Sequence, residues 1–126
     1  MSAIHWFELP VDDISRACTF YGSVLNAELK PMDLTETMGT HIAMIPHEEG
    51  TGGMLVQGRE QGYVPSVEGS LLYLAVKGDM DGALGRVEAG GGQVILPKTS
   101  LGDADPGFIA WINDTEGNRV GLYSKE

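Results

Sequence analysis

The stretch FELPVDDISRACTFY covers residues 7–21. It contains the end of a predicted strand, then Asp13, and then the start of a predicted helix. Apolar residues recur at helical spacing over residues 14–25, and Asp13 is a natural N-cap because its carboxylate accepts from unpaired backbone N–H groups. The same pattern returns 66 positions later, where Asp79 precedes a second helical run. The chain is therefore predicted to contain two copies of one unit.

Strand patterns around both helices predict the order β-α-β-β-β in each copy. Gly90-Gly91-Gly92 ends the second helix. We interpret residues 1–126 as a single domain in which repeats 1–58 and 70–126 are joined by a connector, 59–69. This predicts an α+β fold, in which two βαβββ modules form curved mixed sheets around a cleft with the helices outside. The predicted strands are residues 4–9, 27–33, 40–45 and 53–57, then 71–76, 93–96, 107–113 and 119–124.

The composition restricts partners and location. The 126 residues include 18 acids and 8 bases, and the formal net charge of −10 repels nucleic acid and anionic membranes. No apolar run approaches the roughly 20 residues of a membrane span, and the opening MSAIHWFELPVDD lacks the pattern of a secretory signal. The single cysteine, Cys18, cannot form an internal disulfide. We expect a cytoplasmic protein that binds neither nucleic acid nor membrane.

Three stretches resemble the vicinal oxygen chelate superfamily, which includes glyoxalase I, bleomycin-resistance proteins and extradiol dioxygenases. They are residues 7–21, residues 74–94 (LAVKGDMDGALGRVEAGGGQV) and residues 107–124 (GFIAWINDTEGNRVGLYS). The resemblance covers nearly the whole chain and implies the paired βαβββ fold, a small-molecule site and a homodimer. Because that superfamily contains both metal enzymes and metal-free binding proteins, the fold alone does not decide the function.

In the metal enzymes, the resemblance implies a divalent ion held by His, Glu or Gln side chains from the first and fourth strands of each copy. The corresponding positions here are Trp6, about Met54, Leu71 and Gly121. None suits such an ion, because an indole only donates, a thioether is soft, and leucine and glycine offer no donor atom. A register shifted by one would bring His5 to the first position, but that shift turns the whole strand over. We expect no metal site, and Gly121 is interpreted as a vacancy that leaves room for an organic ligand.

Strand alternation places two groups of side chains on the inner face of the predicted cleft. Trp6 and Glu8 share this face in the first copy, and Tyr73, Arg119 and Tyr123 share it in the second. Aromatic rings with one carboxylate and one guanidinium are typical of small-molecule sites. With Trp111 from the neighbouring strand, the predicted ligand-binding residues are Trp6, Glu8, Tyr73, Trp111, Arg119 and Tyr123.

Glu8 is the candidate catalytic residue. A carboxylate on the inner face of an apolar strand needs a partner, a raised pKa or a function. One interpretation pairs it with Arg119 or a tyrosine hydroxyl, simply to close the cavity. The others make it a ligand contact, a general base or a displaced metal ligand.

Three functions follow from these observations. The first is a metal-free protein that binds a small, partly apolar organic molecule in the cleft between the modules. The second is a glyoxalase-like lyase, isomerase or dioxygenase whose site is rearranged around a divalent metal. The third is a metal-free enzyme that uses Glu8 as a general base next to a carbonyl group. The sequence favours the first and leaves the choice between binding and catalysis open.

Overall fold

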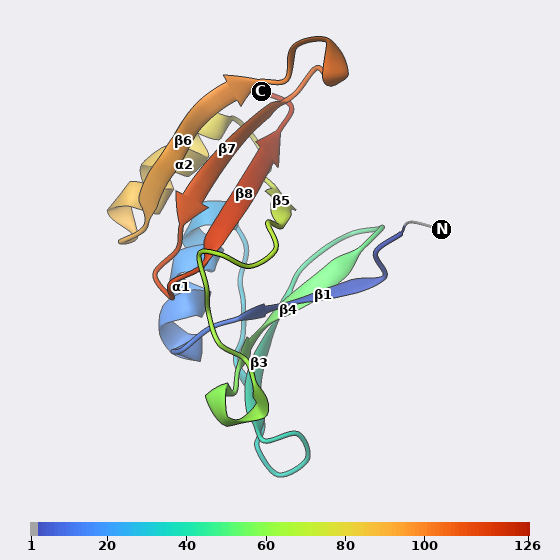
Figure 1. Ribbon diagram of the computed structural model, residues 1–126, viewed down its shortest axis with the longest axis vertical. Helices are drawn as coiled ribbons and strands as arrows, with labels where there is room; N and C mark the ends of the chain where they lie inside the picture. The colour runs from blue at the N-terminus through green and yellow to red at the C-terminus, as the bar shows by residue number, and fades with distance from the viewer. Residues whose placement is uncertain (1–2) are drawn as a thin grey trace.

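The computed structural model describes residues 3–126, and Figure 1 shows its two helices and its strands. Residues 1 and 2 of the predicted first repeat lie outside the described residues. The order of elements confirms the α+β class and the two βαβββ modules predicted from the sequence. In chain order the elements are β1 (Trp6–Pro10), α1 (Ile14–Leu25), β2 (Met32–Leu34), β3 (Thr40–Ile45), β4 (Gly52–Gln57), the short 3-10 helix η1 (Arg59–Gln61), β5 (Tyr73–Ala75), α2 (Met80–Ala89), β6 (Gln93–Ser100), the 3-10 helix η2 (Gly102–Ala104), β7 (Phe108–Asn113) and β8 (Arg119–Ser124).

Both helices begin where the sequence predicts. The carboxylate of Asp13 accepts from the N–H of Arg16 at 3.0 Å, and that of Asp79 accepts from the N–H of Gly82 at 3.0 Å. Helix α1 ends at Asn26, which adopts the left-handed backbone conformation that closes many helices. Among residues 3–126, no helix is both long enough and apolar enough to cross a bilayer.

The strands form two four-stranded mixed sheets, in the orders β1-β4-β3-β2 and β5-β8-β7-β6. In each sheet the first and last strands of the module pair in parallel, and the other pairs are antiparallel. Two strands, β2 and β5, are shorter than predicted by three residues or more. Strand β2 begins at Met32 and not at residue 27, because Pro31 lacks the N–H that a ladder position needs. Strand β5 is confined to Tyr73–Ala75.

One hydrophobic cluster runs through both modules. Each helix packs on its own sheet and the two helices pack against each other, so Leu9 and Leu55 of the first sheet share a cluster with Leu122 of the second. The two helices therefore meet at the junction between the modules (Figure 1). Each sheet has a second face, which we call its free face and which is turned away from this cluster. Trp6, Glu8 and Met44 lie on the free face of the first sheet, and Tyr73 and Trp111 on that of the second.

Glu116, in the turn between β7 and β8, joins the second module to the start of α1. It is 5% exposed, and its carboxylate accepts from the backbone N–H groups of Asp12 at 3.0 Å and Asp13 at 2.8 Å. The Nε of Arg16 donates to it at 2.6 Å. Burial alone would raise the pKa of Glu116, but the hydrogen bonds from Arg16, Asp13 and Thr115 outweigh burial and hold this pKa below its usual value.

A second buried bond fixes the same turn. The hydroxyl of Tyr21, on α1, donates to the carboxylate of Asp114 at 2.6 Å. Burial first, and then the neighbouring Asp114 carboxylate, raise the pKa of Tyr21 well above its ordinary value. The Tyr21 hydroxyl therefore remains a donor, and the contact between the modules is polar as well as apolar.

Candidate functional site

Four of the six predicted site residues share the free face of the second sheet. Tyr73 lies opposite Gly121 in the β5–β8 ladder, and Trp111 lies opposite Gly121 in the β7–β8 ladder. Arg119 and Tyr123 stand two positions before and after Gly121, so alternation places them on the same face. The structure thus brings Tyr73, Trp111, Arg119 and Tyr123 onto one surface.

These side chains form a connected row. The indole Nε1 of Trp111 donates to the hydroxyl oxygen of Tyr73 at 2.7 Å. The guanidinium carbon of Arg119 lies 5.7 Å from the centre of the Trp111 ring, within range of a cation–π contact. The Nε of Arg119 is buried and, among residues 3–126, has no hydrogen-bond partner. The row therefore contains a positive charge and two aromatic rings in contact.

A hollow of about 450 Å³ opens at the Tyr123 end of this row. The hydroxyl of Tyr123 is held beside it by the carboxylate of Asp105, and that hydrogen bond raises the pKa of Tyr123. A hollow walled by aromatic and aliphatic carbon suits a flat organic molecule. The residues that line it are Tyr73, Ala75, Leu101, Ile109 and Tyr123.

Sequence reasoning missed three lining residues, Ala75, Ile109 and Leu101. Ile109 lies opposite Tyr123 in the β7–β8 ladder and two positions before Trp111, so strand alternation carried the signal that could have found it. Leu101 lies between β6 and η2, in a loop without a periodic pattern. Only the fold places its side chain at the hollow.

Gly121 does not leave a vacancy. A Cβ atom built on Gly121 would lie 2.5 Å from Cδ1 of Tyr73, closer than real Cβ atoms approach their neighbours. The prediction of empty space at this position was therefore wrong, because the Tyr73 ring occupies it. The glycine permits close approach of a neighbouring side chain, which is one of the two reasons for a glycine inside a strand. The hollow of about 450 Å³ lies beside Tyr73 and not over Gly121.

Trp6 and Glu8, the other two predicted site residues, lie on the free face of the first sheet. Glu8 is exposed and accepts from the hydroxyl of Tyr63, in the connector, at 2.9 Å, a hydrogen bond that raises the pKa of Tyr63. The partner of Glu8 is thus a tyrosine hydroxyl and not Arg119. Trp6 meets the edge of the His47 ring, with 6.2 Å between ring centres. Among residues 3–126, no hydrogen bond, ion pair or ring contact joins Trp6 or Glu8 to the row on the second sheet.

The strand registers identify equivalent positions in the two modules. The N–H of Val11 donates to the carbonyl of Val56 in the first module, and the N–H of Val76 donates to the carbonyl of Tyr123 in the second. These two hydrogen bonds are equivalent, so a residue a given number of positions before one bond corresponds to the residue the same number of positions before the other. This correspondence can be applied to the positions where the resemblance implies metal ligands. The equivalent pairs are Trp6 with Leu71 and Met54 with Gly121.

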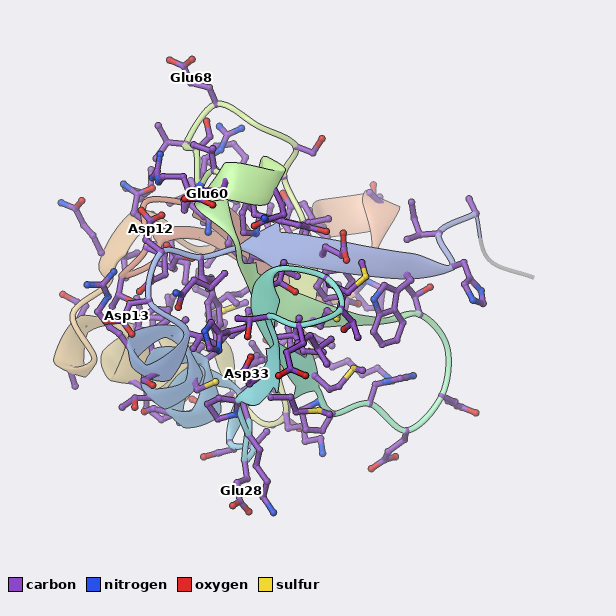
Figure 2. The ribbon with its side chains drawn as sticks, turned by 90° about the horizontal axis from the view of Figure 1, so that it is seen from below. Asp12, Asp13, Glu28, Asp33, Glu60 and Glu68 are labelled. Atoms are coloured by element: carbon purple, nitrogen blue, oxygen red, sulfur yellow. The ribbon has the colours of Figure 1, made fainter. Side chains whose placement is uncertain are left out.

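Acidic side chains are spread over the described chain and do not gather at one point. Figure 2 shows Glu28 and Glu68 pointing outward at opposite edges of the molecule, with Asp33 on a separate strand between them. Among residues 3–126, no three His, Cys, Asp or Glu side chains come together in a group able to hold a metal ion. The negative charge of the chain is thus a property of its whole surface.

Comparison with known sequences identifies one family. The sequence model of the Glyoxalase/Bleomycin resistance protein/Dioxygenase superfamily matches residues 3–122. Two curated relatives, each named "Putative glyoxylase CFP32", come from Mycobacterium bovis and Mycobacterium tuberculosis and are 29% identical to this chain over 121 residues. The alignment covers 94% of this chain and 44% of each relative, so the chain spans less than half the length of these relatives.

Solved structures share the fold. A glyoxalase/bleomycin resistance protein from Albidiferax ferrireducens T118 superposes with a TM-score of 0.76 at 15% identity, over 99% of this chain and 100% of that chain. Glyoxalase I from Zea mays superposes with a TM-score of 0.64 at 18% identity, over 95% of this chain and 45% of that chain. At these identities the similarity establishes the fold and nothing finer.

Proposed function

The chain belongs to the Glyoxalase/Bleomycin resistance protein/Dioxygenase superfamily, and on that premise we propose that it is a binding protein for a small, flat, partly apolar organic molecule. The ligand lies on the free face of the second sheet, and the protein holds no tightly bound metal ion. The observation that carries the proposal is the hollow of about 450 Å³ beside Tyr73 and Tyr123, next to the Trp111 ring. Its volume and aromatic walls are those of small-molecule sites.

Two features of the chain support the metal-free part of the proposal. The matched registers align Trp6 with Leu71 and Met54 with Gly121, and none of these side chains offers a hard or borderline donor atom. The Tyr73 ring also occupies the space over Gly121 into which a metal-binding side chain would extend.

Metal analysis tests this part directly. We expect the purified protein, after dialysis against a chelator, to contain far less than one equivalent of Mn, Fe, Co, Ni or Zn. Adding Ni²⁺ or Zn²⁺ should leave the melting temperature unchanged, because a ligand stabilises the folded state only if it binds that state. A stoichiometric metal that survives dialysis would contradict the proposal and favour the metal-dependent enzyme.

Binding of a neutral flat probe tests the site itself. Naphthalene-2-carboxamide should quench the tryptophan fluorescence saturably, with a dissociation constant of about 1 mM or below, as expected from about 0.3 kcal/mol for each of its non-hydrogen atoms. Ile109→Asp, which places a charge in the wall of the hollow, should weaken binding about tenfold. Ile95→Asp, at an exposed isoleucine on β6 outside the hollow, is the matched control and should bind normally. Circular dichroism verifies that both variants fold, and the absence of saturable quenching would refute the proposed site.

A homodimer and a cytoplasmic location complete the proposal. Large apolar side chains are exposed on both free faces: Trp6 (39%) and Met44 (46%) on the first sheet, and Tyr73 (45%) on the second. Exposed apolar side chains gathered on one face commonly mark an interface. A second copy that places its first sheet over the second sheet of its partner would cover them. The cytoplasmic location rests on the single cysteine, Cys18, which cannot form an internal disulfide.

A further inference from the structure

We infer that the molecule bound on this face is a flat aromatic carboxylate, whose negative group binds Arg119 while its rings occupy the hollow. The inference rests on the proposed function and adds the chemical class of the ligand. Three observations support it. Arg119 and Tyr73 each have a hydrogen-bond donor without an acceptor among residues 3–126, the row is positive at Arg119 and negative at Asp105, and an apolar hollow lies beside the row.

Arg119 differs from the other arginines of the chain. Among residues 3–126 it is the one arginine whose side chain donates to no oxygen atom, although the chain contains 18 acids. An enclosed N–H on a charged group without an acceptor is uncommon in folded proteins, since nearly all such groups find a partner. The acceptors of the others are the Glu116 carboxylate for Arg16, the Asp12 carboxylate for Arg59, and the carbonyls of Ser23 and Val24 for Arg86.

The contact with Trp111 does not replace an acceptor. An aromatic ring interacts with the face of a guanidinium, whereas its N–H bonds point outward in the guanidinium plane. The contact with Trp111 therefore leaves the buried Nε–H of Arg119 without an acceptor among residues 3–126. A carboxylate matches the guanidinium plane because its two oxygens can accept two parallel N–H bonds.

Tyr73 provides a second unmatched donor between Arg119 and the hollow. Its oxygen accepts from Trp111, so its own O–H is directed elsewhere, and among residues 3–126 no acceptor receives it. The opposite end of the row carries a negative charge at Asp105, whose pKa is lowered by the hydrogen bond from Tyr123. An anionic group is repelled there and attracted at Arg119. The charges thus orient the ligand along the row.

The number of positive charges favours a monoanion. The four strands of the second sheet contain two basic residues, Lys98 and Arg119. Lys98 is 3.9 Å from the carboxylate of Asp81 on α2, which places it on the helix side of the sheet. Arg119 is therefore the one basic residue that the strands of this sheet place on the free face. The protein as a whole has a net charge of −10. A single carboxylate is matched by that one charge, whereas a phosphate dianion is not.

A pair of probes that differ in charge tests the inference. Naphthalene-2-carboxylate and naphthalene-2-carboxamide share the same rings, and their affinities for the protein can be measured by calorimetry. We expect the wild-type protein to bind the acid about tenfold more tightly than the amide, or more. Arg119→Gln should bring the two affinities together, because acid binding loses its positive partner. Arg59→Gln removes the same charge from an exposed arginine outside the row and should keep the preference for the acid.

Each outcome decides a different point. If the wild-type protein binds acid and amide equally, the carboxylate inference is overturned while the proposed binding function stands. If neither probe binds, both the inference and the proposed function fail. If Arg119→Gln does not fold, the salt dependence of the wild-type protein tests the inference instead. Raising the salt concentration from about 50 to 500 mM should weaken binding of the acid and leave binding of the amide unchanged. Equal salt dependence of acid and amide overturns the inference.

Discussion

Replacing Glu116 with alanine is expected to lower the free energy of unfolding by about 2–4 kcal/mol. The Glu116 carboxylate is buried and accepts two backbone N–H groups, from Asp12 and Asp13, as well as the Arg16 guanidinium. Alanine leaves those groups without their acceptor. Because the bonds join the β7–β8 turn to α1, their loss also loosens the contact between the two modules. Urea unfolding followed by circular dichroism measures the effect.

Glu28→Ala is the matched control for this variant. The Glu28 carboxylate is 81% exposed, and its ion pair with Lys30 spans 3.9 Å, so its removal should change the free energy of unfolding by about 0.5 kcal/mol or less. If the two variants unfold at the same urea concentration, Glu116 does not hold the modules together as argued here.

The same carboxylate makes the stability depend on pH. Its pKa in the folded state lies below the unfolded value of about 4.3, so its contribution is complete above that pH and is lost as the pH falls through the folded pKa. The difference in unfolding free energy between the wild-type protein and Glu116→Ala should therefore shrink on acidification through this range. A difference that grows as the pH falls would contradict the assigned direction.

The wild-type protein is expected to have twice the chain mass of 13.5 kDa in solution, and Met44→Asp to have the mass of a single chain. Met44 is 46% exposed on the free face of the first sheet and lies opposite Met54 in the β3–β4 ladder. An aspartate here would place an unpaired charge in the proposed apolar interface, at a cost of several kcal/mol, and should dissociate the dimer. Light scattering coupled to size-exclusion chromatography measures both masses.

Val67→Asp controls for the added charge. Val67 is 48% exposed but lies between η1 and β5, outside both free faces, so this variant should remain a dimer. A monomeric wild-type protein, or a Met44→Asp variant with an unchanged mass, would show that the free faces are not the interface.

Part of the site could be predicted because strand alternation is a local property. Arg119, Gly121 and Tyr123 stand two positions apart, so one assignment placed all three on the same face. Trp111 lies on another strand, and only the β7–β8 register with Gly121 defines which way it faces. The partner of Glu8 was equally out of reach, because Tyr63 is 55 positions away in a connector without a periodic pattern.

The sequence by itself determined the two helices with their capping aspartates, Asp13 and Asp79, and the β-α-β-β-β order of each module, because capping and periodicity act between residues a few positions apart. Only the tertiary structure decided that the Tyr73 ring occupies the space over Gly121 and that Glu116 bonds to Arg16 across 100 positions. It also decided that the free faces turn away from a shared core. Such contacts depend on how two helices and two sheets pack together, and packing between distant segments leaves no periodic signal in the chain.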